Sequence, residues 1–438
     1  MWVWALFAPH PPVIVPEVGG ARRHSAGKTL SGYECLRERL KPEPLSVDRL
    51  LILSPHFSYA EALVLDGSES YFGDLHSFGA SSVALSLAGD PQSARQIARH
   101  VLTVAKPHFT ESAGCRLDHG SFVPLVMLRP LLHESLQVVL ANPVGLSPQE
   151  AYRVGVRLRS YADNLRWGLL ASGDLSHCLA PEGPYGYSPS GLSFEKAAEL
   201  ALRGSSPEPL FALSEYTVTK AGQCGLNSML LFLGLIGSLP VKLHSHEWPF
   251  GVGYLTASCL FGPLPTLLAR RSLEHYFDHQ SLMTREQAQE EVPLPRLWQE
   301  EGAAFVSIHT DQGALRGCIG TLCSCRPSLG EEIIANALSA AFRDPRFRPV
   351  SREELASLRF SVDILSPAEP VADKKDLDPH RWGIIVEDGS RRGVLLPDLD
   401  GIDEVDQQIE VACRKAGIPK GHSPTISRFR VARFQEEP

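Results

Sequence analysis

The sequence predicts an α/β fold with a parallel central sheet for residues 1–262, because short apolar runs alternate there with segments of helical spacing. The clearest run is Leu50–Leu53, which is stopped by Ser-Pro and followed by His56. A run this short, closed by proline, is typical of a strand buried in a parallel sheet. Four such segments each carry a histidine, aspartate or glutamate at or near their ends: Trp2–His10, Asp48–Phe57, Trp167–His177 and Val241–Glu247.

The other elements of this region follow from spacing and turn residues. Asp-Pro opens one predicted helix and proline stands in the first turn of another. Gly183–Ser193 is rich in glycine and proline, and we expect a loop there that serves as a substrate lid. In order, we expect a helix over 21–40, short strands over 61–90, a helix over 90–102, a helix or strand over 117–128, a strand over 135–142, a helix over 147–165, helices over 194–202 and 223–235, and a strand over 251–259.

A second domain is expected, because 438 residues are too many for one ordinary core. Phe261–Pro265 is the predicted linker, and the domain after it has an α+β character. Its predicted elements are a helix over 267–277, a strand over 303–309, a glycine-rich turn over 315–321, a helix over 329–342, a strand over 359–365, a β-hairpin over 384–396 and a helix over 402–416.

Composition narrows the classes of function. The net charge is −8 without a basic run, so we expect no nucleic-acid partner. No stretch approaches the roughly 20 apolar residues of a membrane span, and the apolar N-terminus is interpreted as a first strand, not a signal peptide. Nine scattered cysteines fit a reducing cytoplasm better than a disulfide framework.

The ends of the predicted strands suggest a metal site. Ligands bind at the carboxyl edge of open α/β sheets, which is where these side chains are expected. His10, His56 and Glu247 form a set of two histidines and one carboxylate, which suits Fe(II) and leaves positions open for a substrate and dioxygen. His244 and His246 compete with Glu247 for the third position, and spacing alone does not choose among them.

Three further side chains suit roles around such a metal. His177 follows Gly-Asp-Leu-Ser and has a side chain whose pKa is naturally close to neutrality, which suits proton transfer. His119 can donate a hydrogen bond to a developing oxyanion. Asp174 is better suited to orienting a histidine than to binding the metal.

Residues 1–262 resemble the class III extradiol dioxygenases of the LigB type, a superfamily that includes the Memo proteins. The resemblance implies a mononuclear non-haem Fe(II) site that opens a catechol ring with O2. It implies that His10, His56 and Glu247 bind the metal and that His177 is the acid/base. It also implies that His119 lies next to the metal ligands without binding the metal. Memo-type relatives carry a cysteine in place of the carboxylate. The matching motifs are APHPP (8–12), SPH (54–56), LDHG.FVPL (117–125), SGDLSH (172–177), AG.CG (221–225) and E.PFGVGY (247–254).

In the second domain, ALRGCIGTL (314–322) is the distinctive stretch. Two glycines flank Cys318, and Arg316 is placed to lower the pKa of a thiol there. Cys323 and Cys325 add two thiols, but a zinc site would need a fourth ligand from elsewhere. The alternative is that Cys318 is a small buried residue in a turn.

Residues 266–436 resemble the AMMECR family, which implies an α+β domain but no particular reaction. Such domains occur beside Memo-like proteins and radical-SAM enzymes in bacteria, so the resemblance implies a radical-SAM protein as an alternative partner. The motifs are LRGCIGTL (315–322), FRDPRF.PV (342–350), SVDILSP (361–367), GIIVEDGSRRGVLLP (383–397) and RKAGI (414–418).

Three functions are therefore open. The first is a cytoplasmic Fe(II) dioxygenase that acts on a small aromatic substrate and O2, fused to an AMMECR domain. The second is a Memo-like metal-binding or redox protein, with Zn or Cu as alternative metals, that acts with a radical-SAM partner without cleaving rings. The third is a zinc-dependent hydrolase that uses the same ligands and a water. A homo-oligomer is compatible with all three.

Overall fold

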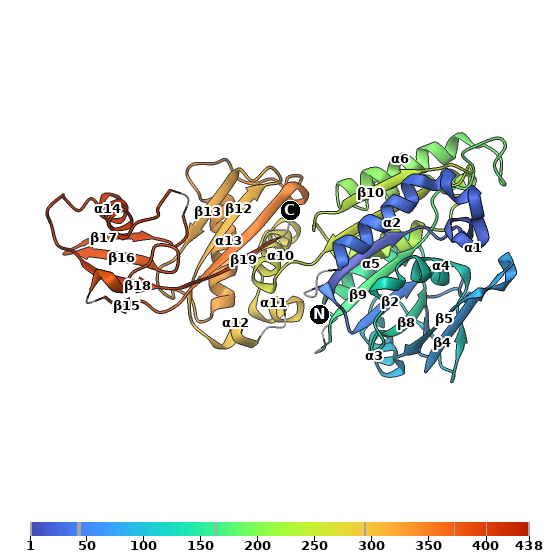
Figure 1. Cartoon of the computed structure of the whole chain (residues 1–438), viewed down its shortest axis with the longest axis horizontal. Helices are drawn as coiled ribbons and strands as arrows, with labels where there is room; N and C mark the ends of the chain where they lie inside the picture. Colours follow the sequence, from blue (N-terminus) through green and yellow to red (C-terminus); the bar gives the residue numbers. More distant parts are fainter. Residues whose placement is uncertain are drawn as a thin grey trace. The chain divides into compact units, whose positions relative to one another are not determined.

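The computed structural model describes residues 2–41, 45–161, 163, 165–292, 295–371, 373–399 and 401–436. The chain divides into two compact units, one formed by 1–261 with 353–356 and the other by 262–352 with 357–438. Figure 1 shows residues 1–261 in blue to yellow-green and the rest of the chain in yellow to red, and each unit has its own sheets and helices. The first unit has the predicted α/β fold, and the second combines separate sheets with helices.

A mixed sheet forms the centre of the first unit, in the order β10-β11-β1-β9-β2-β8-β5-β4-β7, with β3 and β6 attached through β8. The neighbours β1, β9, β2 and β8 run parallel, as predicted. The strands are β1 (Trp2–Ala8), β2 (Arg49–Leu53), β3 (Val64–Asp66), β4 (Ser70–Leu75), β5 (Ala80–Gly89), β6 (His108–Thr110), β7 (Cys115–Arg116), β8 (Gln137–Asn142), β9 (Trp167–Ser172), β10 (Lys242–Glu247) and β11 (Tyr254–Leu260).

Helices cover this sheet on both sides. Side chains alternate across a strand, so Leu6 and Phe7 of β1 point to opposite faces of the sheet. Leu6 joins the core that contains Tyr33 and Phe122. Phe7 packs towards Gly225, which precedes helix α9 (Leu226–Ile236). The helices are α1 (Pro16–Gly19), α2 (Gly27–Leu40), α3 (Pro91–Val101), α4 (His119–Met127), α5 (Pro148–Arg159), α6 (Pro189–Arg203), α7 (Glu208–Phe211), α8 (Glu215–Ala221) and α9 (Leu226–Ile236).

The carboxyl ends of three parallel strands meet at one edge of the sheet. The register pairs Ala8 of β1 with Ser172 of β9, and Leu53 of β2 with Ala171 of β9. The residues that follow these positions therefore leave the sheet side by side. In contrast, β10 is the outermost strand, and β11 lies between it and β1.

Some boundaries in the first unit differ from those predicted. The helix expected over 21–40 begins as a 3-10 segment, Gly20–Ala26, and is α-helical only from Gly27. The ambiguous segment 117–128 contains a helix, α4, whose N-cap Asp118 accepts a hydrogen bond from Ser121 N. The loop expected over 183–193 ends early, because Ser188 caps α6 and proline occupies its first turn.

The second unit contains two four-stranded antiparallel sheets, β13-β12-β14-β19 and β15-β18-β16-β17. Helices α10 and α13 pack on the first sheet and α14 on the second. Its helices are α10 (Leu264–His279), α11 (Arg285–Glu291), α12 (Pro295–Gln299), α13 (Leu329–Phe342) and α14 (Val405–Ala416). Its strands are β12 (Ala303–Thr310), β13 (Leu315–Gly320), β14 (Leu358–Leu365), β15 (Glu369–Pro370), β16 (Gly383–Asp388), β17 (Arg391–Leu395), β18 (Thr425–Phe429) and β19 (Val431–Gln435).

The glycine-rich turn predicted over 315–321 is instead the edge strand β13. Its glycines serve packing, because a Cβ on Gly317 would lie 2.2 Å from the carbonyl oxygen of Ala340 in α13. The strand therefore approaches the helix backbone more closely than any larger residue would allow.

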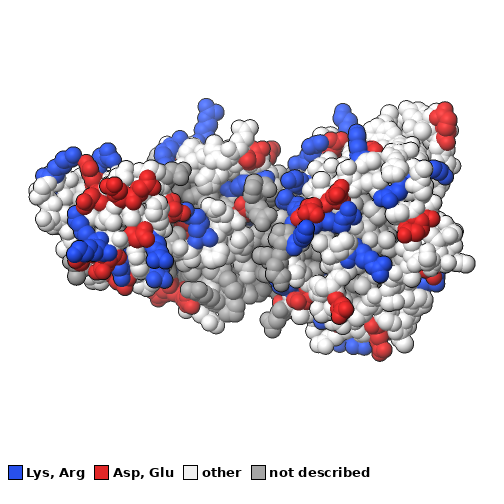
Figure 2. Space-filling view, in the orientation of Figure 1, with Lys and Arg blue, Asp and Glu red and all other residues white. Residues whose placement is uncertain are grey.

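The surface carries both signs of charge. Figure 2 shows acidic and basic side chains interspersed on the visible face of each unit. Within the part of the chain that the structure describes, no helix is long and apolar enough to cross a membrane.

Candidate metal centre

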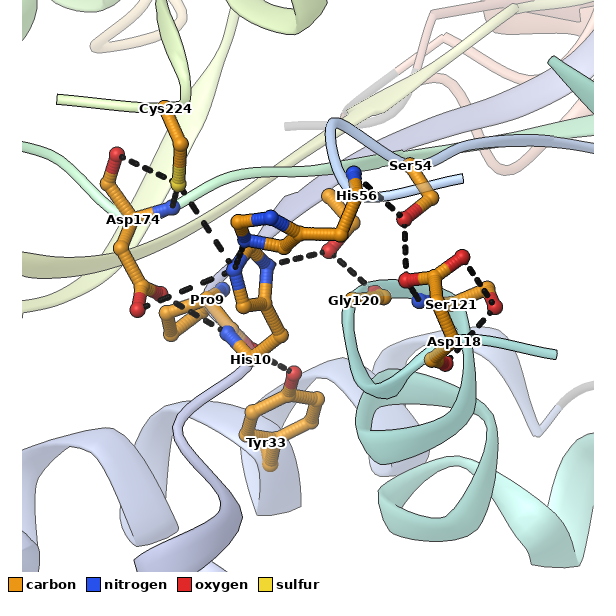
Figure 3. Close-up of polar contacts among 11 residues, drawn as sticks. Pro9, His10, Tyr33, Ser54, His56, Asp118, Gly120, Ser121, Asp174 and Cys224 are labelled. Carbon is orange, nitrogen blue, oxygen red and sulfur yellow. Dashed lines mark hydrogen bonds and ion pairs between the residues drawn. The ribbon is translucent and has the colours of Figure 1, made fainter. Parts of the chain in front are cut away.

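Three metal-competent side chains converge at the carboxyl edge of the parallel strands. His10 follows β1, His56 follows β2, and Cys224 lies in the turn before α9. One ligand atom from each lies within 4.8 Å of the others, and this is the group that the described residues offer for a metal ion. Figure 3 shows the two imidazoles facing each other, with the thiol beside His10.

The hydrogen bonds of Ser172 fix the tautomer of His10. The Ser172 hydroxyl, at the end of β9, donates to the carbonyl oxygen of Gly120 at 2.5 Å. With its hydrogen used there, it accepts from Nδ1 of His10, 2.7 Å away. His10 therefore carries its proton on Nδ1 and presents a bare Nε2 towards His56. A metal-binding histidine needs this arrangement, in which its second nitrogen is anchored.

The backbone at His10 is held from two sides. The Tyr33 hydroxyl of α2 donates to the carbonyl oxygen of Pro9 at 2.5 Å, and the amide of His10 donates to Oδ1 of Asp174 at 2.9 Å. Burial, helped by the neighbouring His56, lowers the pKa of His10 well below its usual value, so the imidazole stays neutral. Asp174 therefore contacts the backbone of His10, and its predicted role in orienting the imidazole stays a prediction. Burial raises the pKa of the Asp174 carboxyl to about 6.

Two glycines bring Cys224 to this place. A Cβ on Gly173 would lie 2.4 Å from the Cα of Gly225, so the turn after β9 touches the turn before α9 only because both residues lack side chains. The amide of Asp174 donates to Sγ of Cys224 at 3.3 Å. Burial, and then the charge of Asp174, raise the pKa of the Cys224 thiol, which keeps it protonated unless a cation binds.

The spacing of the donor atoms fits a transition metal. In a tetrahedral zinc site with bonds of about 2.0–2.1 Å to nitrogen and about 2.3 Å to sulfur, two nitrogens lie about 3.3 Å apart and a nitrogen lies about 3.6 Å from a sulfur. Here Nε2 of His10 lies 3.1 Å from Nε2 of His56 and 3.6 Å from Sγ of Cys224. Two imidazoles and a thiol suit zinc, copper or iron better than magnesium or calcium.

Two more histidines adjoin this group. The ring of His119, at the start of α4, stacks on that of His56 with centroids 4.4 Å apart and planes 22° apart. His177 lies against Tyr185, and its buried Nε2 has no hydrogen-bond partner among the described residues. Burial lowers the pKa of both imidazoles, so both are neutral and able to accept a proton.

Glu247 does not join the two histidines, which corrects its predicted role as the third ligand. Its Oε1 accepts hydrogen bonds from the amide and hydroxyl of Thr29, at 2.6 and 2.7 Å. Thr29 lies in the first turn of α2, where amide groups lack helical partners and favour a negative charge. Because β10 is separated from β1 by β11, its end meets α2 instead of His10.

The two alternative ligands also lie outside the group. Nε2 of His244 pairs with the Ser258 hydroxyl at 2.8 Å. His246 lies between two carboxylates of α6, with Nε2 2.6 Å from Glu195 and Nδ1 3.2 Å from Glu199. The sequence signal for the third member of the metal-competent group was a cysteine between glycines in AG.CG (221–225).

In the second unit, Cys318 is a half-buried residue of β13, not a buried turn residue. The Ser307 hydroxyl donates to its Sγ at 3.1 Å, and its amide donates to Asp344 at 2.9 Å. Arg316 donates to the carbonyl oxygens of Arg348 and Pro349, at 2.7 and 3.2 Å. Cys323 and Cys325 are exposed, and neither belongs to the metal-competent group found among the described residues.

Two family models match the chain. Residues 4–257 match the catalytic LigB subunit of aromatic ring-opening dioxygenase, and residues 266–437 match AMMECR1. A protein of Clostridium acetobutylicum is 31% identical and aligns over 98% of both chains. A protein of Thermotoga maritima is 45% identical over 38% of this chain and 94% of its own length.

Two solved structures are also similar. An uncharacterized protein of Pyrococcus horikoshii matches 40% of this chain and 91% of its own, at 31% identity and a TM-score of 0.35. An uncharacterized protein of Escherichia coli matches 59% of this chain and 99% of its own, at 16% identity and a TM-score of 0.43.

Proposed function

Because this chain belongs to the LigB family and carries an AMMECR1 domain after its LigB domain, we propose that it is a metal-dependent dioxygenase that opens catechol-like rings. The observation that carries the proposal is the convergence of His10, His56 and Cys224, with two neutral histidines beside them. LigB proteins form a dioxygenase superfamily, and the donor spacing fits one transition metal ion.

The residues of the chain have separate tasks in this reaction. His10, His56 and Cys224 would hold the metal, and Fe(II) held there would supply one-electron chemistry between the diol and dioxygen. His177 accepts a proton from a catechol hydroxyl at its unpartnered Nε2. His119 donates a hydrogen bond to the oxygen that develops negative charge. The substrate supplies the electrons that reduce dioxygen, so the reaction needs no other reductant.

The test is metal analysis of the anaerobically purified full chain, combined with O2 uptake on a panel of catechols. We expect one iron per chain and catechol-dependent uptake. His177→Gln should keep the metal and lose uptake. Cys224→Ser should lower metal affinity, whereas Glu247→Gln should leave it unchanged, because Glu247 pairs with Thr29. Equal metal loss in both of the last two variants contradicts the ligand assignment.

One observation favours a second candidate function. The third member of the metal-competent group is a cysteine, as in the Memo-like proteins. We therefore propose, as the second candidate, that this chain has a metal-binding or redox role beside a radical-SAM partner. The same experiment separates the two functions. Stoichiometric metal without O2 uptake on any catechol would support the Memo-like role and rule out ring opening for those substrates.

A further inference from the structure

Two cysteines of the second unit lie next to each other at the surface. Cys323 and Cys325 belong to the loop that leads from β13 to α13, and both are exposed. Exposed thiols are open to exchange with disulfides, which gives this pair a chemistry that a buried cysteine lacks.

A buried carboxylate fixes the loop at both ends. Glu332 of α13 is buried and accepts hydrogen bonds from the Thr321 hydroxyl at 2.7 Å and from the amide of Cys325 at 2.9 Å. Within the loop, the Ser324 hydroxyl donates to the carbonyl oxygen of Arg326 at 2.8 Å. Because these contacts span the segment, the backbone that carries both thiols is ordered before any reaction.

The thiol of Cys325 is directed back towards Cys323. Its Sγ donates to the carbonyl oxygen of Cys323 at 3.5 Å. Partial desolvation, followed by the nearby Cys323 thiol, raises the pKa of the Cys325 thiol. Residues two apart in a chain have Cα atoms at most about 7 Å apart, and disulfides join Cα atoms about 4.4–6.8 Å apart. The two sulfurs can therefore bond without a large movement of the backbone.

A metal ion suits this pair less well than a disulfide does. Structural zinc is almost always held by four ligands. The metal-competent group that the described residues offer lies in the first unit. The nearest carboxylate, Glu332, already accepts hydrogen bonds from Thr321, Cys325 and Asn336. Two thiols without further donors favour reversible oxidation of the pair.

We propose that Cys323 and Cys325 form a redox-active dithiol that reduces accessible disulfides and becomes an intramolecular disulfide. The thiolate of Cys323 attacks one sulfur of the substrate, forms a mixed disulfide and releases the first thiolate. The sulfur of Cys325, once deprotonated, attacks Sγ of Cys323, breaks the mixed disulfide and releases the second thiolate. Both cysteine protons pass through water to the released thiolates, and two electrons pass from the pair to the substrate.

The order of attack follows from the raised pKa of Cys325, because the sulfur that keeps its proton is not the nucleophile. A disulfide between residues so close in sequence closes a small ring, and strained, exposed disulfides are readily reduced. The exchange is therefore reversible. It does not depend on the metal centre, since both cysteines belong to the second unit.

The test is reaction of the full chain with glutathione disulfide without oxygen, followed by acid trapping and mass spectrometry of its peptides. We expect an internal disulfide between Cys323 and Cys325, no retained glutathione on either, and release of reduced glutathione. Cys325→Ser should stop at the mixed disulfide and retain glutathione on Cys323. Cys323→Ser should lose the internal disulfide.

Cys35→Ser is the matched control. Cys35 is also exposed, but no cysteine stands near it in the sequence, so it should retain glutathione in the unchanged chain. Its replacement should leave the internal disulfide intact. Cys318→Ser should do the same, because the Cys318 thiol accepts a hydrogen bond from Ser307 within the sheet.

Three outcomes would overturn the inference. They are glutathione retained on Cys323 in the unchanged chain, an internal disulfide that is lost in Cys318→Ser, and no reaction at either cysteine of the pair. None of them affects the proposed function, which is tested by metal content and O2 uptake.

Discussion

Ser172 accepts a hydrogen bond from Nδ1 of His10 at 2.7 Å while donating its own hydrogen to Gly120, and this relay sets the direction in which His10 offers its lone pair. Both side chains are buried, so water does not take part in the choice.

Ser172→Ala should weaken metal binding by about 10- to 100-fold, the usual effect of removing a residue that orients a metal ligand. The loss follows because Nδ1–H of His10 is left buried without an acceptor and the ring can adopt the other tautomer. Competition with a metal-sensitive dye measures the change. Ser228→Ala is the control, since the buried Ser228 hydroxyl has no partner among the described residues and its loss should leave metal affinity intact. Unchanged affinity in Ser172→Ala contradicts the role of the relay.

Gly173→Ala should also reduce metal binding, although Gly173 contacts no ligand atom. Its new Cβ would lie 2.4 Å from the Cα of Gly225, so one turn must move and Cys224 moves with it. Overpacking of this kind costs about 1–3 kcal/mol of stability. Gly27→Ala is the control. Nothing lies within 4 Å of a Cβ added at Gly27, and its φ of −61° is helical, so stability and metal affinity should both stay unchanged. Metal titration and urea unfolding of both variants give the comparison.

The pair formed by His246 and Glu195 should make the packing of α6 on β10 depend on pH. Burial disfavours the imidazolium of His246, but its contacts with Glu195 and Glu199 outweigh this and raise its pKa. Burial also raises the pKa of the Glu195 carboxyl. A group whose pKa rises on folding stabilises the folded state below its unfolded pKa, and this stabilisation is lost as the pH rises through the folded value.

We therefore expect protection of the β10 amides to fall as the pH rises from about 6 to about 8, around the unperturbed histidine value. Hydrogen exchange corrected for its intrinsic pH dependence measures this. The double variant Glu195→Gln/His246→Gln keeps a polar side chain at both positions but removes both titrating groups, so its protection should change less with pH. An equal or larger fall in the double variant would show that other groups control the region.

In the second unit, Arg270→Met should destabilise the fold by about 3–5 kcal/mol, because it leaves a buried carboxylate without its partner. Arg270 is fully buried in α10, donates to both oxygens of Glu436 at 2.8 and 2.6 Å, and lies 4.8 Å from the Phe360 ring centre. The double variant Arg270→Met/Glu436→Leu removes both charges, so its free energy of unfolding should fall less than that of Arg270→Met. Urea unfolding of the full chain compares the two, and the prediction fails if the double variant is the weaker one.

The fold and two members of the metal-competent group follow from local sequence. The runs before His10 and His56 are short, apolar and closed by proline, so each strand and the residue beyond it could be predicted without knowing any long-range contact. Cys224 could not be predicted in this way. It reaches the others through the contact between Gly173 and Gly225, which leaves no periodic pattern in the sequence.

Glu247, in contrast to Cys224, was predicted as a ligand but does not join the metal-competent group. It has a suitable side chain at the end of a correctly predicted strand, yet the position of that strand at the edge of the sheet directs the carboxylate to α2. Sequence gives the chemical type of a side chain and the end of its strand, but the order of the strands decides which neighbours it meets.

The cysteine gives the proposed centre a weakness that a carboxylate would not have. Oxidation of Cys224 to a sulfenic or sulfinic acid would change a donor atom, whereas a glutamate in the same place is inert to peroxide. Burial slows this damage in the metal-free chain, because the reactive form is the thiolate and the thiol pKa is raised. Exposure to oxidants during purification would therefore lower the metal content of the protein without any change in its fold.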